Sequence, residues 1–343
     1  MLVRDFTDGV DVDQVLLVRQ VEARVKRDGS EYLKVSFGDR TGSVPAMVWE
    51  GVEQVREVCL CGQPVRVVGR FGEHPRYGGQ LTLRALRPAQ PGTFELAELC
   101  DGPPRSADAM EADLRELVAT VQDPWLGRLL ERLLGPASET WARYRHAPAA
   151  KHYHQAYRHG LLEHCLSVAQ GVSAVAAAFG GVDRDVAVTG ALLHDIGKLD
   201  AYTDDPMAID MTDLGRLQGE IPLGYYRIRR EIEELDGFPE ATAAAVLHII
   251  LSHHGSLEHG SPVVPCTREA TLVHFLDNLG GRLGSFDRLE KELPAGQAWS
   301  AFDRALGSGA FFGFAAAASE PGPAVTGPAV QDAPAPGTAF RAA

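Results

Sequence analysis

The amino-acid sequence predicts an α+β protein of two domains, an N-terminal five-stranded β-barrel followed by an all-α helical bundle. Apolar and polar residues alternate in short stretches up to about residue 87, and apolar residues recur with helical spacing from about residue 107. A proline-rich stretch, residues 88–106, separates the two patterns. A chain of 343 residues with 45% hydrophobic content can bury one or two cores, and its length agrees with about two domains.

The β part of the chain begins near residue 14. In residues 31–37, Leu33, Val35 and Phe37 alternate with polar side chains, as one face of a half-buried strand requires. The same alternation predicts further strands over residues 43–49, 64–71 and 80–87. Five short strands with a break near residues 50–60 suit a small closed barrel, and their order is compatible with an OB-fold.

The helical part is expected to begin with two helices within residues 107–134. Further helices are expected over residues 155–179, 184–199, 223–235, 239–253 and 267–283, with one more near 285–306. The tail is rich in Ala, Pro and Gly and predicts disorder. The expected division is a barrel (1–90), a linker and helical segment (91–150), the bundle (151–312) and the tail (313–343).

Composition limits the partners and the compartment. The net charge is −13, but residues 1–90 hold 13 Lys and Arg against 12 Asp and Glu, whereas residues 91–343 hold 20 against 34. A polyanion should therefore meet the N-terminal domain or a local basic groove. Five cysteines without a CxxC pair favour the reducing cytoplasm. No apolar run is long enough for a membrane span, and no signal segment is visible, so no membrane is expected.

The helical part contains a set of candidate metal ligands. His194 and Asp195 are adjacent, and Lys198 follows one helical turn after His194. The other candidates, one or more helices away, are His164, His253, His254 and Asp277. Imidazole and carboxylate groups without thiolate suit Mn²⁺, Fe²⁺, Co²⁺ or Zn²⁺ in a catalytic site, and Asp195 has two oxygens with which to bridge two ions. The pattern predicts a metal-dependent phosphohydrolase.

These residues resemble the HD-domain phosphohydrolase superfamily, whose signature is His…His-Asp…Asp. Five stretches resemble more closely the YhaM-type 3′→5′ exoribonucleases: residues 147–151, 160–164, 192–198, 251–255 and 260–262. The resemblance covers roughly residues 10–310. That family places an OB-fold before an HD domain, which is also the order that the periodicity predicts here.

The resemblance implies a role for each residue. His164, His194, Asp195 and Asp277 would hold a first metal, and Asp195 would bridge to a second one held also by His253 and His254. Glu220 stands where the family usually has a histidine, and its carboxylate would shift the preference toward Mn²⁺. One or two ions per chain are therefore expected. Asp195 and Lys198 are the expected catalytic residues, and Lys198 would offset charge on the phosphate oxygens.

The barrel is expected to bind the nucleic acid. Tyr32 and Trp49, together with Phe71 and Tyr77, offer aromatic rings for stacking on bases. Cationic side chains that could follow the phosphates are Lys34, Arg66, Arg70 and Arg84. In the helical part, Arg227, Arg229 and Arg230 either line a strand channel or, as the sequence favours, pair with nearby glutamates on an exposed helix face.

The sequence therefore predicts a metal-dependent 3′→5′ exonuclease that converts single-stranded RNA or single-stranded DNA to 5′-nucleoside monophosphates, and a homo-oligomer would suit it. One alternative is an HD-type phosphodiesterase or nucleotidase that acts on small nucleotides. Against a cyclic-dinucleotide phosphodiesterase, the chain reads Gly260-Ser261-Pro262 where those enzymes carry Gly-Tyr-Pro. The other alternative is a single-strand-binding protein whose helical domain has lost catalysis.

Overall fold

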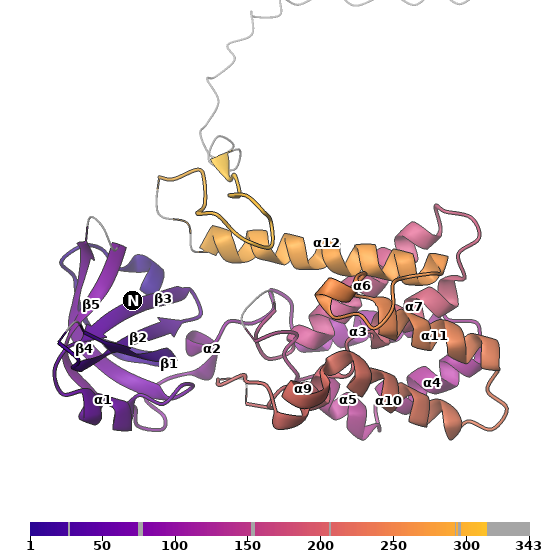
Figure 1. Ribbon diagram of the computed structural model, residues 1–343, viewed down its shortest axis with the longest axis horizontal. Coiled ribbons are helices and arrows are strands. Elements are labelled where there is room, and N and C mark those ends of the chain that lie inside the picture. Colours follow the sequence, from indigo (N-terminus) through magenta and orange to yellow (C-terminus); the bar gives the residue numbers. More distant parts are fainter. Residues whose placement is uncertain are drawn as a thin grey trace, which may run out of the picture. The chain divides into compact units, whose positions relative to one another are not determined.

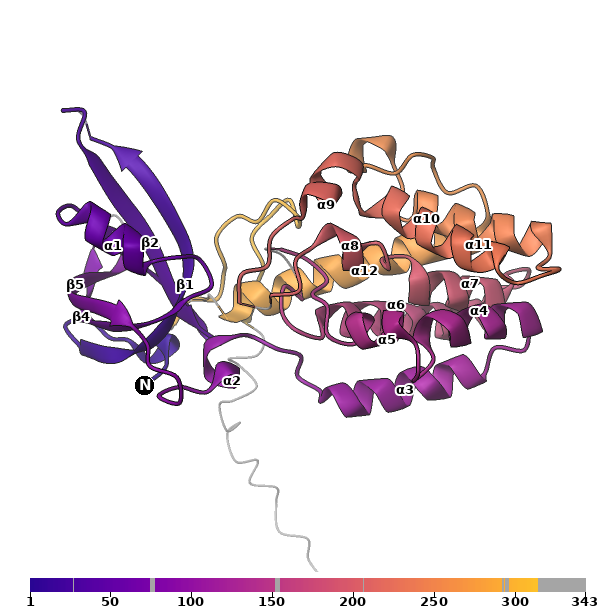
Figure 2. The same ribbon diagram turned by 90° about the horizontal axis from the view of Figure 1, so that it is seen from below.

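The computed structural model describes residues 1–26, 28–74, 78–151, 155–205, 207–291, 293 and 296–313. The chain divides into two compact units, residues 1–292 and 293–343. The first unit contains both a β-barrel and a helical bundle (Figures 1 and 2). No helix within the described residues combines the length and the apolar character that a bilayer span requires.

The N-terminal part is a closed five-stranded barrel (Figure 1). Its strands are β1 (Asp11–Val25), β2 (Glu31–Asp39), β3 (Gly42–Val48), β4 (Pro64–His74) and β5 (Gly78–Pro88). They pair in the order β1-β2-β3-β5-β4, and the barrel closes because β1 also pairs with β4. The connection from β3 to β5 is parallel, with Ala46 opposite Leu81. This arrangement confirms the predicted OB-like barrel, and the helix α1 (Val52–Val58) occupies the predicted break.

The alternation in the strands separates the barrel core from its outer surface. Leu33, Val35 and Phe37 are fully buried, as their spacing predicts. Phe71 is also buried, and its ring centroid lies 5.6 Å from that of Phe6. Of the two roles that the sequence leaves open for Phe71, a base-stacking ring or a core residue, the structure shows the core residue. Tyr77 lies outside the described residues.

Four helices precede the bundle centre: α2 (Leu96–Leu99), α3 (Ala107–Ala119), α4 (Pro124–Leu134) and α5 (Glu139–Tyr144). Side-chain caps define where two of them begin. The hydroxyl of Ser106 accepts a hydrogen bond from the Ala109 amide at the start of α3. The carboxylate of Asp123 accepts from the first amides of α4, where Pro124 fits because the first turn needs no amide donor there.

The centre of the bundle is formed by helices that share one apolar core with α3, α4 and α5. They are α6 (Gly160–Ala176), α7 (Arg184–Leu193), α10 (Glu220–Glu233), α11 (Glu240–Ser252) and α12 (Arg268–Lys291). Between α7 and α10 lie two short helices, α8 (Lys198–Ala201) and α9 (Asp213–Gln218). Helix α7 contacts α6 and α11, and α12 runs beside α6 and α7 (Figures 1 and 2). Short 3₁₀ helices cover Val3–Asp5 and Leu257–His259.

Two of the predicted helices differ from the structure. The predicted helix 184–199 is interrupted, because α7 ends at Leu193 and residues 194–197 form a turn before α8. The predicted helix near 285–306 is helical only as far as Lys291, and that part is the end of α12. Residues 296–312 instead contain turns and the isolated bridges Trp299–Phe311 and Asp303–Ser308. Pro294 and Gly296 are residues that end helices in a sequence. The predicted disordered tail lies outside the described residues, apart from Gly313.

Candidate metal centre and nucleic-acid interface

Four helices of the bundle bring the predicted metal ligands together. His164 belongs to α6, His194 and Asp195 follow α7, His253 and His254 follow α11, and Asp277 belongs to α12. Three of these histidines, His164, His194 and His253, are buried, as is Asp195. Buried charged and imidazole groups are rare unless they are paired or bind metal. The tertiary structure thus collects these donors in the interior.

The first group of donors is formed by His164, His194 and Asp277. His164 Nε2 lies 3.1 Å from Asp277 Oδ1 and 3.2 Å from Asp195 Oδ2. His194 Nε2 lies 3.2 Å from His164 Nε2 and 3.4 Å from Asp195 Oδ2. These nitrogen and oxygen atoms therefore face one common point, on which Asp195 also converges.

The second group is formed by Asp195, His253 and His254. His253 Nε2 lies 3.5 Å from Asp195 Oδ1, the carboxylate oxygen that does not take part in the first group. The two oxygens of Asp195 therefore point to two different sets of donors. This is the arrangement that a carboxylate bridging two ions would need.

A backbone or amide oxygen orients each of the four imidazoles. In each ring Nδ1 lies within hydrogen-bond distance of such an oxygen and donates to it, so Nε2 is the atom that faces the site and can bind a metal ion once it has lost its proton. The acceptors are Gln155 Oε1 for His164 at 3.1 Å, Ala191 O for His194 at 2.7 Å, Ile250 O for His253 at 2.8 Å and His259 O for His254 at 2.9 Å.

The donor set fits a divalent metal ion. Asp195 Oδ1 and His253 Nε2 are buried and have no hydrogen-bond partner among the described residues. An unsatisfied buried polar atom costs about 1–3 kcal/mol, and two such atoms that face each other are best satisfied by a cation between them. Imidazole and carboxylate donors suit a borderline or hard divalent ion.

The charged groups of this site shift one another's pKa values. Burial by itself would lower the pKa of His164, but the neighbouring carboxylates of Asp195 and Asp277 outweigh it and raise that pKa to about 9. Burial would raise the pKa of Asp195, but the charges of Lys198 and His194 hold it well below its usual value. The site therefore keeps its carboxylates ionised, as metal ligands must be.

Lys198 lies at the edge of this centre as predicted, but its ammonium group is already paired. Its Nζ donates a hydrogen bond of 2.6 Å to Asp195 Oδ2, and its side chain is 12% exposed. Burial by itself would lower the pKa of Lys198, but Asp195 raises it, so the group stays charged. The predicted contact with a phosphate oxygen stays a prediction.

Glu220, the first residue of α10, lies near one ligand. Its Oε1 is 3.7 Å from His254 Nε2, and it is absent from the groups of three donors found among the described residues. Helix α10 lies very close to residues 194–198. A Cβ on Gly197 would lie 1.9 Å from the Glu220 carbonyl oxygen. Gly197 is thus required for packing, and Glu220 stays a predicted ligand.

Several residues of the site were not predicted. Gln155 orients His164, and His274 Nδ1 donates a hydrogen bond of 2.8 Å to the His253 carbonyl oxygen. The ring of His274 packs on Gly255, where a Cβ would lie 2.0 Å from it. The Cys165 thiol also lies near His194 and Asp195, although the sequence suggested a site without sulfur. The only sequence feature that could have indicated this packing of His274 is the glycine at position 255, directly after two histidines. His152 and His154 lie outside the described residues.

The predicted nucleic-acid-binding residues fall into two groups. Tyr32 and Trp49 stack on the outer face of β2 and the end of β3, with ring centroids 4.6 Å apart and an interplanar angle of 24°. Trp49 is 52% exposed, and Lys26 Nζ lies 5.6 Å from its ring centroid. Lys34 shares this face two residues after Tyr32 and is half-buried. In OB-folds the face of the second and third strands binds single strands.

The predicted arginines lie on other strands. Arg66 on β4 contacts Asp13 at 2.7 Å, and Arg84 on β5 contacts Asp11 at 3.0 Å. Each guanidinium therefore has a carboxylate partner on β1, which reduces its availability for phosphate. Arg70 is exposed on β4 near Gly9. The structure thus groups Tyr32, Lys34 and Trp49 but not the three arginines with them.

The helical segment that carries the donors matches a known family. Residues 161–281 match the HD domain family, and all the donors lie within them. The chain is 29% identical over 290 residues to the 3′-5′ exoribonuclease YhaM of Geobacillus sp. (strain WCH70), a match that covers 83% of this chain and 87% of the relative. The protein of the same name from Bacillus subtilis (strain 168) is 28% identical over 291 residues, which are 84% and 90% of the two chains. These matches confirm the predicted resemblance.

Proposed function

We propose that this protein is a metal-dependent 3′→5′ exoribonuclease that acts on single-stranded RNA. The observation that carries the proposal is the pair of donor groups that share Asp195, within an HD domain that follows an OB-like barrel. The similarity to proteins named 3′-5′ exoribonuclease over more than four-fifths of the chain supports the same activity. Single-stranded DNA is a second candidate substrate, and 5′-nucleoside monophosphates are the expected products.

The metal would be held by the two donor groups, with Asp195 common to both. His164, His194 and Asp277 would hold one ion, and His253 and His254 the other. Divalent ions bound there would act as Lewis acids on the phosphodiester and lower the pKa of water toward about 7. The nitrogen and oxygen donors and the carboxylate of Glu220 near His254 favour Mn²⁺ as the ion.

The chain's own side chains would position the substrate. Lys198 fixes the orientation of Asp195 through its 2.6 Å hydrogen bond and adds positive charge next to the scissile phosphate. Tyr32 and Trp49 would stack on bases, and Lys34 would contact the backbone phosphates. The five cysteines are free thiols, which supports a cytoplasmic location. A homo-oligomer stays a prediction.

The test is a degradation assay with metal-stripped protein. The full chain is incubated with 5′-labelled single-stranded RNA or DNA, with and without Mn²⁺, beside the variants Asp195→Asn and His194→Ala. We expect a ladder of RNA shortened from the 3′ end that needs both the metal and the two donors. His248→Gln is a matched control, because His248 lies on α11 outside the donor groups and accepts a hydrogen bond from the Cys266 amide.

Three results separate the alternatives. Full activity of Asp195→Asn would refute the assignment of this carboxylate. Binding of intact RNA without metal-dependent decay would identify a single-strand-binding protein. Intact RNA without binding would redirect the search to small nucleotides, as expected for a nucleotidase or phosphodiesterase.

A further inference from the structure

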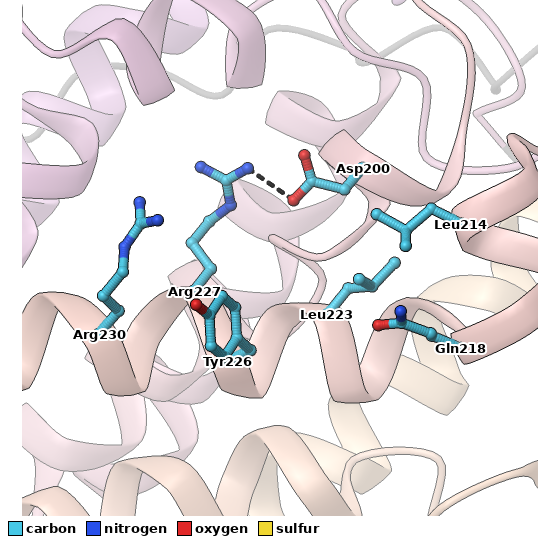
Figure 3. A pocket seen from close by; sticks show the side chains of 7 residues that line it. All are labelled: Asp200, Leu214, Gln218, Leu223, Tyr226, Arg227 and Arg230. Atoms are coloured by element: carbon cyan, nitrogen blue, oxygen red, sulfur yellow. Dashed lines mark hydrogen bonds and ion pairs between the residues drawn. The ribbon is translucent and has the colours of Figure 1, made fainter.

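A cavity of about 490 Å³ lies between α8, α9 and α10, and its lining residues are distinct from the metal donors (Figure 3). Glu220 begins α10, whereas the residues that line the cavity start at Leu223 and end at Arg230 on the same helix. At 1.5 Å per residue, Arg230 lies about 15 Å along the helix axis from Glu220. On α10 the cavity lining therefore begins about one turn after Glu220 and extends away from that residue.

One wall of the cavity carries excess positive charge. Arg227 is 17% exposed, and its terminal amino group donates a hydrogen bond of 2.6 Å to Asp200. The same carboxylate also accepts from Arg143 at 3.2 Å, so two guanidinium groups share one anion. Arg227 Nε is buried without a hydrogen-bond partner among the described residues. The other terminal amino group donates a hydrogen bond of 3.4 Å to the Thr140 hydroxyl, so the side chain of Arg227 is held in place beside the cavity.

Arg230 adds a second cation on the same side of α10. Figure 3 shows the guanidinium groups of Arg227 and Arg230 extending from the helix side by side. The guanidinium of Arg230 lies 3.8 Å from the carboxylate of Glu231, which Arg132 already holds at 2.8 Å. The prediction that glutamates pair with this run of arginines therefore holds for Arg229, which contacts Glu233 at 2.7 Å, and for Arg230 at the longer distance. It does not hold for Arg227, which pairs with Asp200.

The rest of the lining is suited to a flat ring. Tyr226 is 65% exposed and Leu214 is 41% exposed, so both offer apolar surface to a ligand in the cavity. Leu223 forms the apolar floor, and the amide of Gln218 can exchange hydrogen bonds with a polar ring edge. Paired guanidinium groups beside an aromatic ring are a combination that recognises phosphate together with a base.

We propose that this cavity is a second nucleotide-binding site, in which Arg227 and Arg230 hold a phosphate and Tyr226 contacts the base. Its volume falls in the usual range for small-ligand sites. Its positive charge stands out because residues 91–343 hold 20 Lys and Arg against 34 Asp and Glu. The nucleotide is either a unit of the bound strand or a free nucleoside monophosphate. Only the first form rests on the proposed exoribonuclease function.

Binding to catalytically silent protein tests the site. Full-length protein in EDTA is titrated with AMP by calorimetry and with a fluorescent ten-nucleotide oligoadenylate by anisotropy. The test variant is Arg230→Gln, whose side chain is 58% exposed, so the fold should tolerate the change. The matched control is Arg229→Gln, because Arg229 is adjacent and exposed but absent from the cavity lining. Tyr226→Ala tests the base contact separately.

We expect Arg230→Gln to weaken binding roughly tenfold, since it removes a charge-assisted hydrogen bond, whereas Arg229→Gln changes it less than about twofold. A loss of AMP affinity assigns the site to free nucleotide. A loss confined to the oligoadenylate assigns it to the strand. Equal affinities of Arg230→Gln, Tyr226→Ala and the wild type for both probes would overturn the proposal. If AMP binding depends on Arg230 but RNA is never degraded, the site stands and the exoribonuclease proposal fails.

Discussion

Replacement of Gly197 by alanine should damage the metal centre through the backbone that surrounds it. The added Cβ would lie 1.9 Å from the Glu220 carbonyl oxygen and 2.5 Å from the Gly224 amide nitrogen. Real Cβ atoms essentially never come closer than 3.0 Å to such atoms, so residues 194–198 and α10 must separate by at least 1.1 Å. Gly197 has an ordinary φ of −67°, so the cost arises from this contact and not from backbone strain.

The expected magnitudes follow from this displacement. Forcing extra volume into a packed contact usually costs about 1–3 kcal/mol of unfolding free energy. A misplacement of about 1 Å can also lower catalytic rate about 100-fold. Lys198 follows Gly197 directly and binds Asp195, so the displacement acts on a group at the centre. Thermal unfolding followed by circular dichroism measures the first effect, and metal-dependent RNA degradation measures the second.

Gly127→Ala provides the matched control. Gly127 lies within α4, and a Cβ there would have nothing within 4 Å. This substitution should therefore stabilise the protein by about 0.5–1 kcal/mol, because alanine favours the helix. A Gly197→Ala variant with the same melting temperature and RNA degradation rate as the wild type would refute the reasoning, since it would mean that α10 is not packed tightly against residues 194–198.

Three further outcomes are expected. Trp49→Ala should weaken RNA binding by about 1–3 kcal/mol, the value of one stacked base, while hydrolysis of bis(p-nitrophenyl) phosphate stays unchanged; unchanged RNA affinity by anisotropy would remove this face from the interface. Mn²⁺ at about 100 times its dissociation constant should stabilise the wild type by about 2.7 kcal/mol in thermal unfolding and Asp195→Asn by much less, and an equal shift in both would contradict the assignment. Burial would raise the pKa of Glu111, but hydrogen bonds from Arg145 and Arg115 lower it below 4.5. The stabilisation from ionised Glu111 is therefore present above pH 4.5 and is lost as the pH falls through the pKa of Glu111 in the folded state. Glu111→Gln should thus destabilise the protein by up to about 1 kcal/mol at about pH 7 and by less at about pH 3, and a pH-independent effect in denaturant titrations would contradict this.

Much of the fold was predictable because its signals are local. Alternation places Leu33, Val35 and Phe37 inside the barrel, and the structure buries all three. Helical spacing predicted the bundle, but it extended one helix across residues 194–197, where the chain turns. A three-residue hydrogen-bond pattern such as that from the Lys198 amide to the Asp195 carbonyl oxygen leaves no clear mark in hydrophobic periodicity.

The sequence by itself determined which chemical groups are available: adjacent His194 and Asp195, a lysine three residues later, and further imidazoles and carboxylates on other helices. The tertiary structure alone decided how these groups meet. It turns the two oxygens of Asp195 toward different histidines. In the folded protein Arg66 and Arg84 pair with carboxylates, and Arg230 lies beside a cavity. The physical reason is distance along the chain. These partners lie on separate helices and strands, so packing of the core sets their separations, and no local pattern records them.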